Sequence, residues 1–285
     1  METRRERSAA GVGTDVGVSY GRSYALQTSD VYAELRRETF EPDIGQHSWL
    51  TAAEYDELSE WLEVGPDDFV LDVGCGAGAP GLRLAARAGC RLLGIDVQAE
   101  AIATANERAV AQGRAERARF EIRDAAQPLA YDDAAFDALI SIDAIQHLPD
   151  RRRTLAEWAR VLRPGGRAVF TDSLVLTGAL TNEEIATRSA IGFSVFIPRG
   201  YNRDTLEEVG LRVVRAEDHT EPMIATATRL RAARAAREAA LRALEGDDMY
   251  DGQQALLEIA ARLGRERRLS RFAYLAVKDD EASPR

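Results

Sequence analysis

The feature that most constrains the fold is a repeated unit in the middle of the chain, from about residue 67 to residue 176. In each unit a short apolar run ends at small or acidic residues and is followed by a helical pattern that glycine or proline closes. This alternation predicts βαβ units and a parallel sheet, because a parallel neighbour can be reached only by a crossover connection. The predicted fold class is therefore α/β.

The pattern gives seven strands with helices between them. The strands are expected at residues 69–73, 91–96, 119–123, 136–142, 167–171, 211–216 and 271–277. The helices are expected at residues 52–63, 82–88, 99–112, 152–162, 203–209, 222–244 and 251–262. Thr51 with Glu54, and Thr181 with Glu184, predict capping boxes, in which each side chain accepts a hydrogen bond from the backbone N–H of the other residue.

We expect one large domain, since 285 residues are long enough for a single core with an appendage. Its segments are described by their boundaries. They are a flexible N-terminus at 1–19, a helical segment at 20–64, the core at 65–176 and a C-terminal part of the core at 177–285 that carries helical caps at 177–201 and 221–266.

Composition excludes several classes of protein. The net charge is −10 with a pI near 5.0, which argues against a nucleic-acid partner, because such binding needs a basic face. The Arg/Ala-rich run at 229–243 is accordingly interpreted as a solvated amphipathic helix. Cys75 and Cys90 are too few for a disulfide framework or a metal site, and no apolar run approaches the ~20 residues that span a bilayer. We therefore expect a cytoplasmic protein with no metal and no membrane contact.

A glycine-rich turn follows the first strand, in the sequence LDVGCGAG at residues 71–78. Gly74, Gly76 and Gly78 occupy alternate positions, where the backbone must bend sharply and a ligand can approach without side chains in the way. The turn also matches the dinucleotide fingerprint, with Asp96 ~20 residues further on. A nucleoside-like ligand is therefore expected, and a nicotinamide oxidoreductase has to be weighed.

Three further features argue against a dinucleotide. Asp72 places a carboxylate near the position of an anionic pyrophosphate, although it could attract a cationic ligand. The third strand is followed by Asp124 and Ala125, which add polar groups at the carboxyl edge of the sheet. A proline-glycine reversal at residues 164–166 leads into the fifth strand.

With these motifs the chain resembles the class I S-adenosylmethionine-dependent methyltransferases of the small-molecule type. They include quinone C-methyltransferases, sugar O-methyltransferases and glycine or phosphoethanolamine N-methyltransferases. The resemblance lies in LDVGCGAG (71–78), GIDV (94–97), RDAAQPL (123–129), FDALISIDAIQHLPD (136–150) and VLRPGGRAVF (161–170). It implies a Rossmann-like sheet of seven strands, the last antiparallel, flanked by helices. It also implies S-adenosylmethionine as methyl donor and S-adenosylhomocysteine as product.

The resemblance further implies roles for individual residues around the cofactor. Asp72 would hold the ammonium end, Asp96 the ribose hydroxyls, and Asp124 with Ala125 the adenine. The turn would pass under the methionyl part and ribose, and Ser141, Ile142 and Asp143 would lie beside the sulfonium. The full set expected to bind the cofactor is Asp72, Gly74, Cys75, Gly76, Gly78, Asp96, Val97, Asp124, Ala125, Ser141, Ile142, Gln46, Ser48 and Trp49.

Methyl transfer from a sulfonium needs alignment of the acceptor and no nucleophilic residue. A hydroxyl or an acidic carbon gains from a general base, for which His147 is the best-placed candidate, together with Asp143. The alternative interpretation of His147 is a packing residue of its turn. His219 follows the sixth strand and is expected on the surface, with the acceptor pocket as the other possibility.

The acceptor is expected to be a small molecule of bacterial specialised metabolism, methylated on N, O or C. The N-terminal segment and the helical caps would roof its pocket. The apolar residues 191–201 would line this pocket or form the core of the lid. Tyr20 and Tyr24 could fold over the site. A homodimer is a further expectation, since the cap helices could instead pack against a partner. Another reaction on the same fold, such as a cyclisation that uses the sulfonium charge, stays open beside the oxidoreductase.

Overall fold

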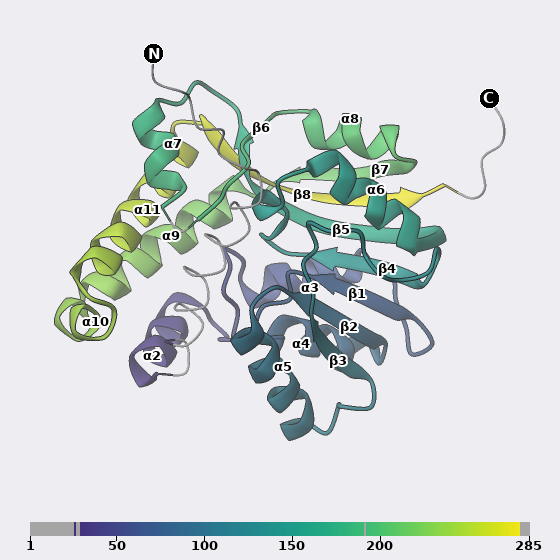
Figure 1. Ribbon diagram of the computed structural model, residues 1–285. Helices are drawn as coiled ribbons and strands as arrows, with labels where there is room; N and C mark the ends of the chain where they lie inside the picture. The colour runs from purple at the N-terminus through teal and green to yellow at the C-terminus, as the bar shows by residue number, and fades with distance from the viewer. Residues whose placement is uncertain (1–25, 27–28, 191, 280–285) are drawn as a thin grey trace, which may run out of the picture.

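The structure is a computed structural model and is described for residue 26, residues 29–190 and residues 192–279. The predicted flexible N-terminus at 1–19, Tyr20, Tyr24 and Ile191 lie outside the described residues. Within them, a central sheet is flanked by helices on both faces, and a further group of helices gathers at one end (Figure 1).

The sheet has eight strands in the described part of the chain, in the order β3-β2-β1-β4-β5-β8-β7, with β6 beside β5. They are β1 (Phe69–Val73), β2 (Arg91–Asp96), β3 (Ala118–Ile122), β4 (Phe136–Ser141), β5 (Leu162–Leu176), β6 (Ile197–Pro198), β7 (Leu211–Asp218) and β8 (Leu269–Lys278). Strand β8 is antiparallel to both neighbours, and the other pairings are parallel. The α/β fold with an antiparallel last strand is thus confirmed, and the two-residue β6 accounts for the extra strand.

Alternate side chains of each strand enter two separate cores. Val70 packs on one face with residues of α3 (Ala52–Glu60), α4 (Ala79–Ala88) and α5 (Ala99–Ala111), whereas Leu71 faces α6 (Arg151–Val161) and α8 (Tyr201–Glu208). Successive residues of a strand point to opposite sides of the sheet, so a continuous apolar run supplies side chains to both cores. The result is a three-layer arrangement in which the carboxyl ends of the parallel strands share one edge.

The remaining helices form a cap beyond that edge (Figure 1). The cap consists of α2 (Asp30–Thr39), α7 (Asn182–Arg188), α9 (Thr220–Ala235), α10 (Glu238–Glu245) and α11 (Asp247–Arg265). Tyr32 and Leu35 of α2 pack with Ala233, Leu241 and Tyr250 of the last three helices. The N-terminal segment and the C-terminal insertion are thereby joined, although they are far apart in the sequence.

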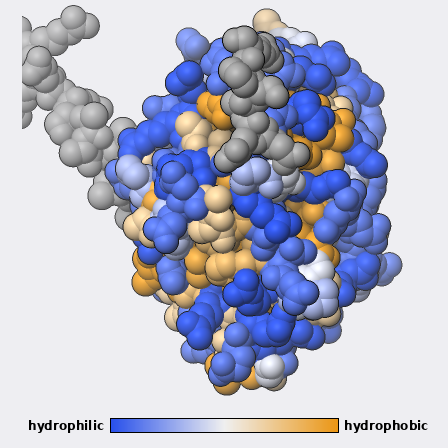
Figure 2. Space-filling view, turned by 90° about the vertical axis from the view of Figure 1, so that its right-hand side faces the viewer, coloured by the Kyte–Doolittle hydropathy of each residue, from blue (hydrophilic) through white to orange (hydrophobic). Residues whose placement is uncertain are grey.

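The side on which β8 ends is mainly hydrophilic, with apolar residues between the charged ones (Figure 2).

Two predicted elements differ from the structure. Strand β5 begins at Leu162, because the proline-glycine reversal is a bulge within the strand: Phe136 pairs with Leu162 and Ala138 already pairs with Arg167. The helix predicted at 222–244 is broken after Ala235, although no glycine or proline stands there. At the break, Arg237 forms ion pairs with Glu34 and Glu38 of α2.

The two predicted capping boxes had different outcomes. The Thr181–Glu184 box is present in both directions. Thr51 does accept from the backbone N–H of Glu54, but the Glu54 carboxylate turns inward to Arg271 and His219 and does not return to Thr51. His219 is likewise buried, so its expected surface position is wrong. Among the described residues no helix combines the length and apolar character needed to cross a bilayer.

Candidate active site

The glycine turn connects β1 to α4 and has an unusual backbone. Gly74, Gly76 and Gly78 have φ values of 74°, 52° and 75°, in the left-handed region that favours glycine. A Cβ on Gly74 would lie 2.3 Å from the Cβ of Ala144, and one on Gly78 would lie 2.6 Å from the Cβ of Ala105. The sharp bend expected at these glycines is present, and at Gly74 and Gly78 the chain's own packing also requires glycine.

Two carboxylates flank this turn. Asp96, at the end of β2, accepts hydrogen bonds from the backbone N–H groups of Gly76 at 3.0 Å and Gln98 at 2.9 Å. Asp72, at the end of β1, is 5% exposed, and no ion pair of Asp72 is found among the described residues. Burial and the charge of Asp96 raise the pKa of Asp72 to about 7. Burial also raises the pKa of Asp96. Such a pair fits a ligand that brings a cation and hydroxyl donors, and repels a pyrophosphate.

A small cavity of about 60 Å³ opens over the turn. Asp72, Gly74, Cys75, Gly76 and Ile142 are among its lining residues. Arg108 of α5 lines it as well and donates to the carbonyl of Ala77 at 2.8 Å. Arg108 could not be predicted from the sequence, because one arginine on a helix face carries no local signal.

The residues predicted to surround an adenine form an open edge. Asp124 is exposed and accepts a hydrogen bond from the N–H of Ala126 at 2.8 Å, and Ala125 is half-buried. Val97 is 49% exposed and Ile122 61% exposed, at the ends of the adjacent strands β2 and β3. Such apolar side chains in contact with water suit the face of an aromatic ring. Ile122 was not singled out by the sequence analysis.

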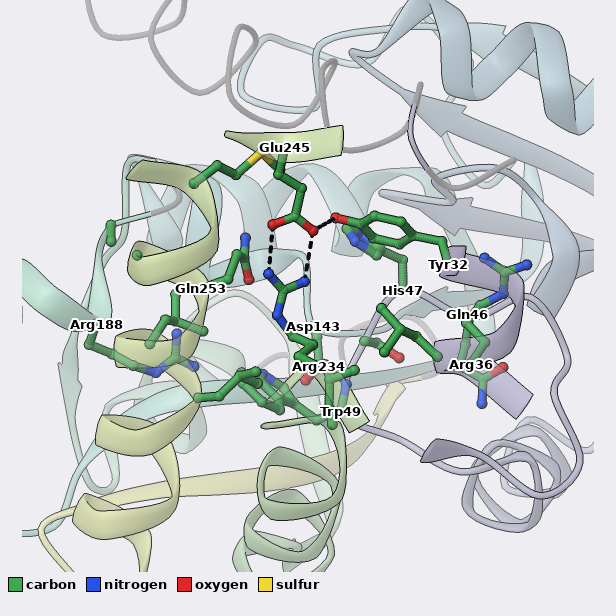
Figure 3. A pocket seen from close by; sticks show the side chains of 18 of the residues that line it. Tyr32, Arg36, Gln46, His47, Trp49, Asp143, Arg188, Arg234, Glu245 and Gln253 are labelled. Atoms are coloured by element: carbon green, nitrogen blue, oxygen red, sulfur yellow. Dashed lines mark hydrogen bonds and ion pairs between the residues drawn. The ribbon is translucent and has the colours of Figure 1, made fainter. Parts of the chain in front are cut away.

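A second cavity, of about 840 Å³, lies between the sheet edge and the cap (Figure 3). Its apolar walls include Leu35, Phe40, Leu230, Leu256 and Leu257, from α2, α9 and α11 and the segment after α2. None of the described residues 192–201 lines it, so that prediction is wrong for them. Val195 and Ile197 pack into the sheet core instead.

The segment of Gln46, His47, Ser48 and Trp49 lies at the boundary between the two cavities. All four residues line the larger cavity, and His47 and Ser48 line the smaller one too. Gln46 is 1% exposed; its Oε1 accepts from the N–H of Ile44, and its Nε2 has no hydrogen-bond partner among the described residues. The three residues that the sequence analysis chose here thus lie together at the site.

The loop after β4 adds polar groups to the larger cavity. Asp143, Gln146 and His147 line it, whereas the buried Ser141 hydroxyl donates to the carbonyl of Val73 at 2.9 Å. Nδ1 of His147 lies 2.8 Å from the carbonyl oxygen of Phe193. A carbonyl only accepts, so Nδ1 carries the proton and Nε2 carries the lone pair. Burial lowers the pKa of His147 below its ordinary value. The imidazole is therefore neutral near pH 7.

The opposite wall holds a buried ion pair. Arg234 donates to both oxygens of Glu245, at 3.0 and 2.6 Å, and the Tyr32 hydroxyl donates to Glu245 at 2.6 Å. Figure 3 shows the Arg234 guanidinium pointing to Glu245, with Tyr32 beside it. The three residues come from α9, α10 and α2, so the pair holds the cap together.

Comparison with known proteins agrees with this geometry. A family model described as a methyltransferase domain matches residues 70–166. The methyltransferase GfsG of Streptomyces halstedii is 33% identical over 185 residues, which are 60% of this chain and 65% of that protein. The sarcosine/dimethylglycine N-methyltransferase of Halorhodospira halochloris is 31% identical over 195 residues, or 68% of each chain. The chain thus spans about two thirds of the length of these relatives.

A solved structure shares the fold. The cyclopropane synthase MmaA2 from Mycobacterium tuberculosis superposes with a TM-score of 0.77 at 17% identity, over 91% of this chain and 98% of that one. The family expected from the motifs is confirmed, and with it S-adenosylmethionine as the cofactor. The chain belongs to the class I S-adenosylmethionine-dependent methyltransferases.

Proposed function

We propose that the protein transfers the methyl group of S-adenosylmethionine to a small molecule held in the larger cavity. The observation that carries the proposal is the position of the two cavities, which meet at His47 and Ser48. A donor over the glycine turn and an acceptor under the cap would face each other there. The test is incubation with S-adenosylmethionine and a panel of small hydroxy and amino compounds, followed by mass spectrometry for a product that has gained one methyl group.

Several residues would hold the cofactor in this proposal. Asp72 would bind the ammonium group and Asp96 the ribose hydroxyls, because carboxylates accept such donors strongly. The carboxylate of the methionyl end would be met by Arg108 and by Nε2 of Gln46, which is buried without a partner among the described residues. The adenine would lie against Val97 and its neighbours, with Asp124 at its amino group. These assignments go beyond the family match and stay proposals.

The chemistry asks little of the protein beyond position. The bound sulfonium supplies an activated methyl group. The chain's own residues align the acceptor, exclude water and remove a proton where the acceptor is a hydroxyl. The neutral tautomer of His147, with its lone pair on Nε2, suits that last task.

The acceptor would be a mostly apolar molecule that presents an N–H or O–H group. Gln146 is 4% exposed, and its Nε2 donates to the backbone carbonyl of Asp143 at 2.6 Å. Its Oε1 has no hydrogen-bond partner among the described residues, although it belongs to a residue that lines the cavity. A buried acceptor of this kind is costly unless a ligand satisfies it. The apolar walls would bind the rest of the molecule.

We extend the proposal to a place in bacterial specialised metabolism, supported by the 33% identity over 166 residues to the 27-O-demethylrifamycin SV methyltransferase of Amycolatopsis mediterranei. The cytoplasmic location, the absence of nucleic-acid partners, the homodimer and the domain boundaries stay predictions. No specific observation favours a cyclisation over methyl transfer.

Cofactor affinity is expected to depend on pH through Asp72. Its pKa is raised to about 7 in the free protein, and an ammonium group would favour the ionised form. Affinity for S-adenosylhomocysteine should therefore rise with pH, by roughly tenfold from pH 6 to pH 7.5, with release of a proton on binding. Calorimetric titrations in two buffers of different ionisation enthalpy check this. Asp72→Asn should bind more weakly and lose the dependence, and a flat wild-type profile would contradict the assignment.

Replacing Gln146 by leucine is expected to raise the KM for the acceptor by about tenfold, because the hydrogen-bond acceptor is lost. Affinity for S-adenosylhomocysteine should stay within about twofold of the wild type. Gln254→Leu is the matched control, since Gln254 lies on α11 and bonds to Arg231 and Tyr250. Steady-state kinetics with the best acceptor from the panel provide the measurement. An unchanged KM would remove Gln146 from the acceptor site.

A further inference from the structure

A buried chain of charged groups links β8, α3 and the loop after β4. Arg271 of β8 is fully buried, and its guanidinium contacts Asp143 on one side and Glu54 on the other. Glu54 also lies 2.7 Å from Nδ1 of His219. Although burial opposes both charges, Arg271 and His219 lower the pKa of Glu54, and the two carboxylates raise the pKa of Arg271. Glu54 and Arg271 are therefore both ionised near neutral pH.

Asp143, at one end of this chain of charged groups, has an uncommon backbone conformation. Its φ is 50°, in the left-handed region that residues other than glycine seldom adopt. Oδ1 accepts from Arg271 Nε at 2.8 Å and from Thr171 Oγ1 at 2.9 Å. Oδ2 accepts from the backbone N–H of Trp49 at 3.1 Å and from Arg271 Nη2 at 3.3 Å. A carboxylate offers about four lone-pair sites, and here four donors use them.

The contact with Trp49 connects the charged chain to the site. Trp49 is the last residue of the segment 46–49, which lines the larger cavity and in part the smaller one. Its ring packs against Ile224, Ala227 and Leu257 of the cap. The hydrogen bond to Asp143 thus ties the boundary between the two cavities to the end of β4.

The buried ion pair of Arg151 and Asp172 serves as a comparison, because it lies away from both cavities. Arg151 and Asp172 are 2.8 Å apart and almost fully buried, and Asp172 also accepts from Asn202. Neither residue of this pair lines either cavity. The group of charged residues around Arg271 differs, because its carboxylate Asp143 accepts a hydrogen bond from Trp49 of the segment 46–49.

We propose that Arg271 is a positioning residue, anchored by Glu54, that acts through Asp143 to hold the segment 46–49 between the cofactor and the acceptor. The proposal rests on the proposed function for the identity of the two ligands. It gives Asp143, which was predicted to be catalytic, a positioning role, because its oxygens are fully engaged.

The variants Asp143→Asn and Arg271→Lys test the proposal, with Asp172→Asn as the matched control. In Asp143→Asn the amide oxygen can keep Thr171 and Arg271 Nε, while the amide nitrogen would face the N–H of Trp49, donor against donor. Hydrogen–deuterium exchange of the peptide that covers residues 46–50 reports directly on the segment. Calorimetric titration with S-adenosylhomocysteine reports on the cofactor pocket, and thermal melting shows that each variant is folded.

We expect exchange in the 46–50 peptide to increase about tenfold in Asp143→Asn and less in Arg271→Lys, which keeps the charge. Affinity for S-adenosylhomocysteine should fall about tenfold in Asp143→Asn. Asp172→Asn should lower the melting temperature by at least as much as Asp143→Asn does. It should change neither the exchange of the 46–50 peptide nor the affinity for S-adenosylhomocysteine. Unchanged exchange in Asp143→Asn, or an equal increase in Asp172→Asn, would overturn the proposal. If the wild type fails to bind S-adenosylhomocysteine, the proposed function fails, and the exchange comparison still decides the role of Arg271.

Discussion

Replacing His147 by alanine is expected to lower kcat by about 10²–10⁴-fold for a hydroxyl acceptor, the usual contribution of a positioned base. The physical reason is the fixed tautomer: Nδ1 donates to the carbonyl of Phe193, so the lone pair is on Nε2. Affinity for S-adenosylhomocysteine should stay within about twofold, because His147 does not line the smaller cavity. Single-turnover kinetics and calorimetry measure the two quantities separately.

The pH dependence of kcat provides the control for His147. Its pKa is lowered by burial, so the neutral imidazole persists to more acidic pH than in a free histidine. The acidic fall of the wild-type kcat should therefore lie at lower pH than an ordinary histidine would give. The variant should lack this acidic limb. A kcat that is unchanged in His147→Ala would leave the residue a packing role only.

Replacing Asp96 by alanine is expected to weaken binding of S-adenosylhomocysteine by about a hundredfold or more. Two charge-assisted hydrogen bonds to ribose hydroxyls would be lost, each worth ~1.5–3 kcal/mol. The same carboxylate also accepts from the N–H groups of Gly76 and Gln98, so the turn itself would loosen. Isothermal titration calorimetry at pH 7.5 gives the affinity directly.

Asp96→Asn serves as the isosteric control for that experiment. The amide keeps one oxygen for the backbone or for a hydroxyl, so its affinity should fall between those of the wild type and Asp96→Ala. Undiminished affinity in Asp96→Ala would show that the ribose hydroxyls do not bind there. The adenine edge around Asp124 would then have to carry the specificity.

Local sequence pattern was sufficient for the sheet and for the turn. Strands β1 and β2 begin and end at the predicted residues, because each is an apolar run that small or acidic residues bound. The Thr181–Glu184 capping box formed because both partners lie within one helical turn. Asp72 and Asp96 could be found in the same way, as each ends a strand beside the glycine turn.

Contacts between distant segments could not be predicted. Asp143 and Arg271 are 128 positions apart, and Tyr32 and Glu245 are 213 apart. Glu54 occupies the position of a capping residue, yet the two buried side chains that it contacts, Arg271 and His219, come from the far end of the chain. The walls of the larger cavity come from α2, α9 and α11 for the same reason. A motif fixes local geometry, whereas these pairings depend on how the cap folds over the sheet.

The most direct test of the account is calorimetric titration of the full chain with S-adenosylhomocysteine and, in parallel, with NAD and NADP. The buried carboxylate of Asp72 carries the distinction, because it favours a ligand with an ammonium group and repels a pyrophosphate, whereas Asp96 could hold the ribose of either ligand. We expect one micromolar site for S-adenosylhomocysteine and no detectable heat from either dinucleotide. Binding of a dinucleotide in place of S-adenosylhomocysteine would contradict it.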